Sequence, residues 1–197
     1  MPHVVTWAYS DADGPVHVGF DNRRAAREMT RRVLDFGHRE LAVISGIGAH
    51  NDRVRDRLAG IRAAGAACPG ARLSQVIEAR YDPGAGADCF RRIMAAATPP
   101  TAIICGNDVL AAGALLAARQ MGIAVPARVS VVGFDDIELA SLVYPPLTTV
   151  RVPQVEMGHI TARLLLDLVA GHTDRRSVLL QAEIILRALL GPPRLPA

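Results

Sequence analysis

The sequence predicts an α/β protein built on largely parallel sheets that are flanked by helices. Short runs rich in Val, Ile and Leu alternate with Ala-, Leu- and Arg-rich stretches of helical periodicity along the whole chain. Several short runs, such as 41–44 and 129–132, are almost continuously apolar, which is typical of strands covered by helices on both faces. With 197 residues, 50% of them hydrophobic, the chain can bury a sizeable core in one large domain or two small lobes.

The strands are predicted from short β-rich runs bounded by turn residues. In chain order we expect them at Val4–Trp7, Val16–Phe20, Leu41–Ser45, Gln75–Arg80, Thr101–Cys105, Val129–Phe134, Thr148–Val152 and Val178–Leu186. Helices are indicated where Asp or Asn precedes a periodic stretch and Gly ends it. These signals predict helices from Asn22 to Gly37, Asp52 to Gly65, Asp108 to Gly122 and Val155 to Ala170.

Composition excludes several classes of function. The chain contains no lysine, so all of its 22 basic residues are arginines, and a Schiff base or a P-loop ammonium is impossible. The arginines are scattered and the formal net charge is only +3, so the chain by itself is not expected to read DNA. Three cysteines without CxxC spacing favour a reducing compartment, and neither a signal peptide nor a long apolar stretch is recognisable, so we expect a cytoplasmic protein with no membrane contact.

Polar residues gather directly after the predicted strands, which is where open α/β sheets bind ligands. Tyr81, Asn107, Asp135 and Gln154 occupy such positions, and together they offer an aromatic face, two amides and a carboxylate. This set suits a small polyhydroxylated or heterocyclic molecule. The neighbouring Asp108 is expected to be a helix cap, and Arg57, judged by its chemistry alone, a solvated surface charge.

Catalysis is not expected, because no histidine stands in a recognisable triad or nucleophile elbow. His38 reads as a turn or packing residue and Cys105 as an apolar filler. The Asp135-Asp136 pair could hold Mg²⁺, but receiver-type sites also need a lysine, so no metal is expected. Gly46-Ile47-Gly48 matches a dinucleotide loop only weakly, since Asn51 stands where the third glycine would be, and we therefore expect no cofactor.

Six blocks spread over the chain carry a family resemblance. They are VGFDN (18–22), FGHRELAVI (36–44), RLAGI (57–61), CGNDVLAAGA (105–114), VSVVGFDD (129–136) and PPLTTV (145–150). In this order they make the sequence from Val16 to about Leu190 similar to the regulatory domain of LacI/GalR-type bacterial transcription regulators. The resemblance implies a periplasmic-binding-protein-like fold of type I, in which an effector between two lobes changes the operator affinity of the full-length protein.

The resemblance also implies how the chain is divided. Residues 1–37 and 152–176 would be the remnant of an incomplete N-terminal lobe, 38–151 and 177–190 a complete C-terminal lobe, and 191–197 a tail. Members of the family begin with a helix-turn-helix that this sequence does not contain, so the chain resembles an N-terminally truncated regulator. Alone it is expected neither to bind operator DNA nor to hold an effector at full strength.

Binding positions follow from the same resemblance. Effector contacts are implied for Arg57, Tyr81, Asn107, Asp135 and Gln154, and less regularly for Arg24 and Arg53. A homodimer interface is implied at Val109, Ala112 and Leu116 on one helix and at Val143 and Tyr144 before the Pro-Pro turn, although an apolar helix face of this kind could equally be core. Two alternatives stay open: an exported sugar-binding protein of the same fold, and an α/β enzyme that uses Asp135 and the Gly46 loop.

Overall fold

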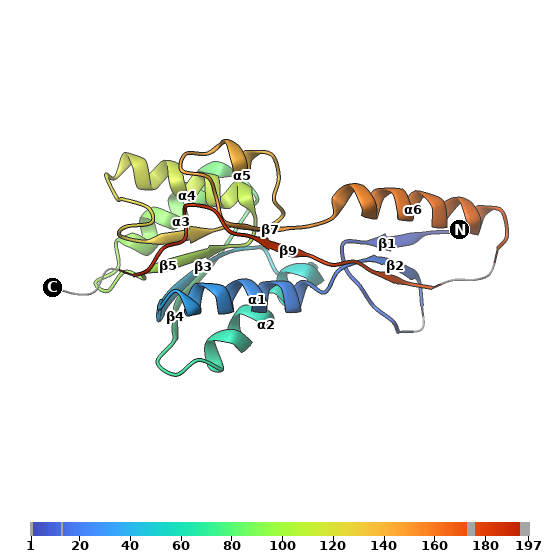
Figure 1. Ribbon diagram of the computed structural model, residues 1–197, viewed down its shortest axis with the longest axis horizontal. Coiled ribbons are helices and arrows are strands. Elements are labelled where there is room, and N and C mark those ends of the chain that lie inside the picture. Colours follow the sequence, from blue (N-terminus) through green and yellow to red (C-terminus); the bar gives the residue numbers. More distant parts are fainter. Residues whose placement is uncertain (1, 13, 173–175, 194–197) are drawn as a thin grey trace.

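A parallel four-stranded sheet forms the centre of the larger part of the protein. The computed structural model describes residues 2–12, 14–172 and 176–193. The strands of this large sheet are β3 (Glu40–Gly46), β4 (Arg72–Ala79), β5 (Ala102–Cys105) and β6 (Ser130–Val132), in the order β4-β3-β5-β6. Helices α1 (Asn22–Asp35) and α2 (Asp52–Ala66) cover one face, and α3 (Pro83–Met94) and α4 (Asp108–Gln120) cover the other (Figure 1).

The apolar runs explain why this sheet is covered on both faces. Successive side chains of a strand point to opposite faces. In β3, Leu41 and Val43 pack with α1 and α2, whereas Ala42 and Ile44 pack with α3 and α4. All four side chains are at most 1% exposed. A strand that is buried on both sides has no polar face, which is why the sequence shows a continuous apolar run instead of alternation.

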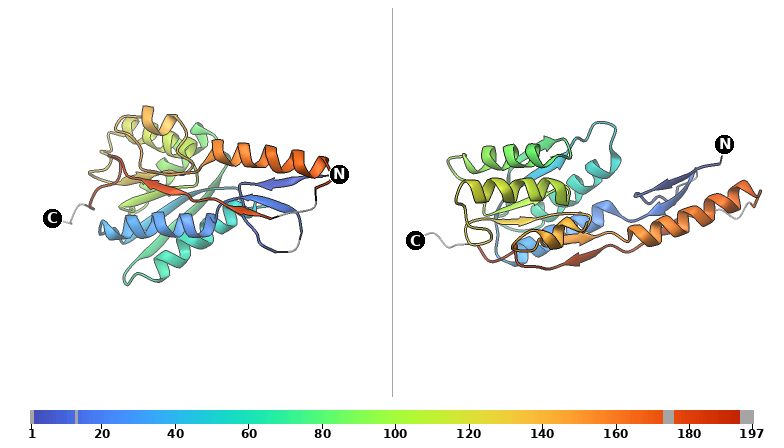
Figure 2. Two further views of the ribbon diagram at one scale, coloured as in Figure 1. Left: turned by 45° about the vertical axis from the view of Figure 1, so that its right-hand side comes forward. Right: turned by 90° about the horizontal axis from the view of Figure 1, so that it is seen from above.

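A smaller sheet lies at the other end of the molecule. It consists of β1 (Val4–Thr6), β2 (Val16–Gly19) and β8 (Val178–Leu179), which are parallel in the order β1-β2-β8, and helix α6 (Gln154–Val169) packs against β1 and β2. Between the two sheets, β7 (Thr149–Arg151) pairs antiparallel with β9 (Glu183–Ile185), and a short helix α5 (Leu139–Leu142) precedes β7. Figure 2 shows these two strands running from the large sheet toward the small one.

Helix starts follow the expected capping chemistry. The side chains of Asp21, Asn51 and Asn107 each accept a hydrogen bond from a backbone N–H of the first turn of α1, α2 and α4. Helix α3 was not among the predicted helices, yet Asp82 caps it in the same way and proline occupies its first position. An Asp-Pro pair before a periodic stretch is therefore the signal by which the sequence could have revealed α3.

Two expected boundaries are wrong because the chain crosses between the two parts elsewhere. Helix α1 packs along its length on α2, so it belongs with the large sheet and not with residues 1–19. The run 178–186 is two strands instead of one: β8 pairs with β2 in the small sheet, and β9 pairs with β7. The chain thus passes from one part to the other near residue 21, near residue 152 and again at 180–182.

Two further expectations concern buried residues. His38 is 1% exposed, and its ring nitrogens lie 2.9 Å from the Thr101 hydroxyl and 2.7 Å from the Gly191 carbonyl oxygen, which makes it a packing residue at the start of β3. Cys105 is also buried, and burial raises the pKa of its thiol.

Within the described residues, no helix is both long and apolar enough to cross a bilayer.

Candidate functional site

Arg57 is the centre of a polar cluster at the carboxyl ends of β5 and β6. Its Nε donates to the Asn22 side chain at 2.9 Å, its Nη1 to the Gly106 carbonyl at 2.8 Å, and its Nη2 to Asp135 Oδ1 at 3.1 Å. The guanidinium also lies 3.7 Å from the centre of the Phe134 ring. Arg57 is only 8% exposed, so the expectation of a solvated surface charge from chemistry alone is wrong.

Asp135 follows β6 and is held from three sides. Its N–H donates to the Val150 carbonyl of β7 at 2.8 Å, its carboxylate pairs with Arg57, and its own carbonyl accepts from the Gln154 amide at 3.2 Å. Gln154 is the first residue of α6, so Asp135 contacts both parts of the molecule. Burial raises the pKa of the Asp135 carboxyl, and the Arg57 cation partly offsets that rise.

Tyr81 and Arg53 border this cluster. Tyr81 follows β4, and its hydroxyl lies so close to Gly46 that a side chain there would overlap it. Burial raises the pKa of the Tyr81 hydroxyl, and the charges of Arg57 and Arg53 act against this rise. Arg53 stands one turn before Arg57 on α2, and its charge, like that of Arg57, opposes the rise of the Asp135 pKa. Both residues therefore lie near the Arg57–Asp135 pair.

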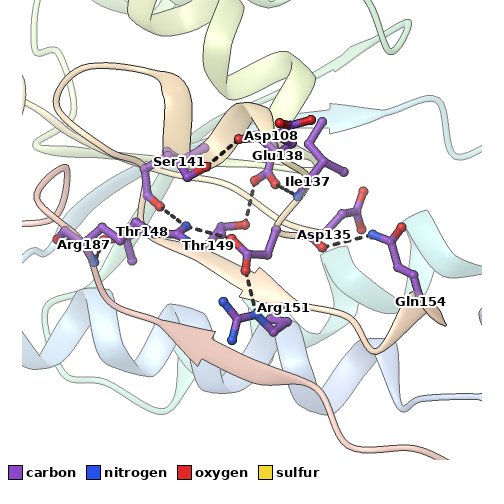
Figure 3. Close-up of polar contacts among 12 residues, drawn as sticks. Asp108, Asp135, Ile137, Glu138, Ser141, Thr148, Thr149, Arg151, Gln154 and Arg187 are labelled. Carbon is purple, nitrogen blue, oxygen red and sulfur yellow. Dashed lines mark hydrogen bonds and ion pairs between the residues drawn. The ribbon is translucent and has the colours of Figure 1, made fainter. Parts of the chain in front are cut away.

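The helix cap that the sequence predicts at Asp108 is formed by Asn107 instead, and Asp108 is a buried core residue. The Asn107 oxygen caps α4 by accepting from the Leu110 N–H at 2.9 Å, next to the Gly106 carbonyl that binds Arg57. Asp108 is not the cap: it is 1% exposed, and its carboxylate accepts from the Thr149 hydroxyl at 2.6 Å and from the Ile137 N–H at 2.9 Å (Figure 3). Burial raises the pKa of Asp108 to about 7 despite these two hydrogen bonds.

Asp136 is a polar residue of this region whose partners sequence reasoning missed. Arg151 Nε on β7 lies 2.7 Å from its Oδ2, and Arg187 Nη1, just after β9, lies 2.7 Å from its Oδ1. Burial by itself would raise the pKa of Asp136, but the hydrogen bonds from Arg187 and Arg151 outweigh burial and lower it. No sequence signal marks this cluster, because its three members lie on separate segments.

The Asp135-Asp136 pair is not arranged as a metal site. The two carboxylates turn to different arginines, one to Arg57 and the other to Arg151 and Arg187. Across the residues that the structure describes, no group of three or more His, Cys, Asp or Glu side chains is placed to hold a metal ion. Binding of an uncharged molecule with several hydrogen-bonding groups fits this donor and acceptor set better.

Arg24 is not brought to this cluster. Its exposed guanidinium donates to Glu28 at 2.8 Å, one turn further along α1. It lines a small groove with Phe20 and the segment 179–182, where the chain crosses between the two parts. Five of the expected positions, together with Arg53, therefore gather at one edge of the large sheet, whereas Arg24 lies on a separate surface.

Four of the five expected dimer residues line an apolar groove on the outer face of α4. Leu116 is 52% and Tyr144 97% exposed, whereas Leu110 on the same helix is fully buried core. The groove has a volume of about 360 Å³ and also includes Ala112 and Val143; Val109 is half-buried on the same helix. The structure thus separates the core face of α4 from its exposed face, which periodicity alone did not do.

Comparison with known proteins gives one family. The family described as periplasmic binding protein-like domain matches residues 30–188. The chain is 34% identical over 173 residues to the HTH-type transcriptional repressor PurR of Salmonella newport, covering 87% of this chain and 50% of the repressor. The chain therefore spans about half the length of the curated relatives that it matches.

Solved structures agree with this family. A transcription regulator named GntR from Chromobacterium violaceum is 34% identical, with a TM-score of 0.88 over 96% of this chain and 70% of that one. A LacI transcriptional regulator from a Rhodococcus species is 28% identical, with a TM-score of 0.87 over 97% of this chain and 70% of that one. The chain belongs to the periplasmic binding protein-like family, in the form that LacI/GalR-type transcription regulators use as their effector-binding domain.

Proposed function

We propose that this chain senses a small sugar-like or nucleoside-like effector and thereby changes the operator affinity of a longer parent protein. The observation that carries the proposal is the position of Asp135. This residue pairs with Arg57 of the large part and accepts from Gln154 of the small part. A molecule that competes for these groups would alter contacts in both parts at once.

The chemistry of the cluster favours a neutral, hydroxyl-rich ligand. The Asp135 carboxylate can accept from two hydroxyls, Arg57 and Arg53 can donate, and the Tyr81 ring offers an apolar face at the rim. The carboxylate is already balanced by a buried guanidinium, so a ligand with a full charge would leave one charge unpaired. A regulator of this fold from Enterococcus faecium, 23% identical with a TM-score of 0.86, holds ribose, which makes D-ribose a reasonable first probe.

Two lobes are proposed, with corrected limits. The small lobe contains β1, β2, β8 and α6, and the large lobe contains α1–α5 and β3–β6. Strands β7 and β9 lie at the crossing, where the ligand-facing loop after β6 bonds to β7. An effector at Asp135 would thus act on the segments that set the angle between the lobes.

Partners are proposed on the same grounds. The groove around Leu116 and Tyr144 is proposed as a homodimer interface, because both of these large side chains are exposed beside it and an exposed apolar groove favours protein contacts. Operator DNA would be bound only through a helix-turn-helix of the parent protein, and such a regulator would act in the cytoplasm. The regulator names of the relatives favour sensing over transport and over catalysis.

A ligand screen tests the proposal. Thermal-shift measurements on the full chain with D-ribose, other sugars, nucleosides and free bases should find a stabilising ligand, and calorimetry should confirm it. Asp135→Asn is expected to weaken that ligand at least tenfold, because it removes a charged hydrogen-bond acceptor worth about 1.5–3 kcal/mol. Asp88→Asn, at a surface ion pair with Arg91, is the matched control and should leave affinity unchanged. A ligand that binds both variants equally would contradict the assignment of this site.

A further inference from the structure

Two consecutive residues in the loop after β6, Asp135 and Asp136, adopt a backbone conformation that side chains disfavour. Asp135 has a φ of 102° and Asp136 a φ of 52°, both in the left-handed region. Consecutive non-glycine residues of this kind are costly and persist only where surrounding contacts hold them. The segment therefore needs anchors: the Asp135 backbone is held by Val150 and Gln154, and the side chain of Asp136 adds two ion pairs.

Asp136 ties this segment to the strands that cross between the two parts. Its carboxyl group is 6% exposed, and each oxygen accepts from a different arginine: Arg151 on β7 and Arg187 after β9. Arg187 is itself fixed, since its Nη1 donates to the Leu147 carbonyl at 2.8 Å and its N–H donates to the Thr148 hydroxyl at 2.9 Å. Asp136 thus makes two short ion pairs, and one of them is largely shielded from water.

The neighbouring Asp135 depends on this anchor for its direction. Its carboxylate lies 3.1 Å from Arg57 in the positive-φ conformation that the segment adopts here. The side chains of the two aspartates diverge, so Asp136 does not contact Arg57, and its own charge serves the crossing strands. A rotation of the backbone at Asp136 would swing the Asp135 carboxylate away from the guanidinium.

We propose that Asp136 is a positioning residue: its ion pairs with Arg151 and Arg187 hold the strained segment so that the Asp135 carboxylate meets Arg57. The proposal rests on the proposed function, because Asp135 matters there as a ligand contact. Asp136 itself does not touch the ligand. Its role is to fix the site and to join it to β7 and β9, the strands at the lobe crossing.

The sign of one pKa change separates positioning from simple electrostatics. Asp136→Asn removes a negative charge beside Asp135 and leaves two arginines without their partner, and both direct effects lower the pKa of Asp135. Loss of position does the opposite. The backbone of Asp135 stays bonded to Val150 and Gln154, so its carboxyl remains buried, and burial is the main cause of its raised pKa. Away from Arg57, the carboxylate loses the cation that opposes this rise, so its pKa rises further.

Carbon-13 NMR titration of the side-chain carboxyls in the full chain measures this change. The Asp135 signal is identified by its absence in Asp135→Asn. In Asp136→Asn the pKa of Asp135 is expected to rise by about one pH unit, given that a near cation shifts a carboxylate by about 1–3. Asp88→Asn is the control and should leave it unchanged. An unchanged or lowered pKa in Asp136→Asn overturns the proposal.

A second variant decides the matter if Asp136→Asn does not fold. Arg151→Lys keeps the charge at a half-exposed position but cannot reproduce the short Nε contact to Asp136. Positioning predicts a smaller rise of the Asp135 pKa in the same direction, and no rise overturns it. Both titrations use no ligand, so they test positioning independently of sensing. A rise of the Asp135 pKa, together with a ligand screen that finds no effector, would refute the proposed sensing function and leave the positioning role intact.

Discussion

Asp108 should make the stability of this protein fall as the pH rises from about 4 to 7. Burial raises the pKa of this carboxyl to about 7 in the folded chain, from an ordinary value of 3.8. Between these two values the folded chain keeps the proton that the unfolded chain has lost. The free energy of unfolding then falls by about 1.4 kcal/mol per pH unit, or about 4 kcal/mol over the whole interval.

Asp108→Asn removes this titration. Asparagine stays neutral, so the variant should lose the downward slope that Asp108 contributes, while any slope from Asp135 remains in both proteins and cancels in the difference. The amide resembles the protonated carboxyl that it replaces, because its oxygen can accept from the Ile137 N–H while its NH₂ group donates to the Thr149 hydroxyl oxygen. Little stability is therefore lost at a pH where Asp108 is protonated. The variant should therefore be about as stable as the wild type at pH 4.5 and about 3 kcal/mol more stable than it by pH 7.5.

Urea denaturation at half-unit pH steps measures the effect. The quantity of interest is the difference in the free energy of unfolding between wild type and Asp108→Asn, plotted against pH. Asp88→Asn, at a mostly exposed carboxylate, should give a nearly flat difference. A flat difference for Asp108→Asn as well would show that the buried carboxylate is ionised throughout and that its two hydrogen bonds outweigh burial.

Three further changes test the packing between α3 and α4, the buried His38 and the proposed dimer surface. Gly113→Ala should destabilise the chain by at least about 1–3 kcal/mol, because a Cβ there overlaps the Pro83 carbonyl between α3 and α4; Gly65→Ala, in open space, should cost nothing in the same urea assay. Desolvation lowers the pKa of His38 in the folded chain, so the stability that the neutral ring contributes is fully present above about pH 6.5 and is lost as the pH falls. In His38→Gln, the free energy of unfolding should no longer show this loss when the pH is lowered. Tyr144→Asp should shift a dimer toward monomer in sedimentation, and an unchanged distribution would exclude this surface as the interface.

The site could be predicted in part, because parallel strands all have their carboxyl ends at the same edge of the sheet, and the residues that follow the strands therefore lie there. Alternating strands and helices place Tyr81, Asn107 and Asp135 at the same edge, whatever the side chains do next. Which polar residue caps a helix and which is buried was not decidable at Asn107 and Asp108, since both residue types can cap and they stand side by side.

The sequence by itself determined the strands, most helices and the family, because these depend on local periodicity, capping residues and short motifs. Only the tertiary structure decided that Arg57 is buried, since its partners Asn22, Gly106 and Asp135 come from three distant segments. It also decided that the stretch 178–186, which the sequence predicts as one strand, is divided: β8 pairs with β2 and β9 pairs with β7. Burial and pairing are set by what the rest of the chain brings alongside, and no local pattern records that.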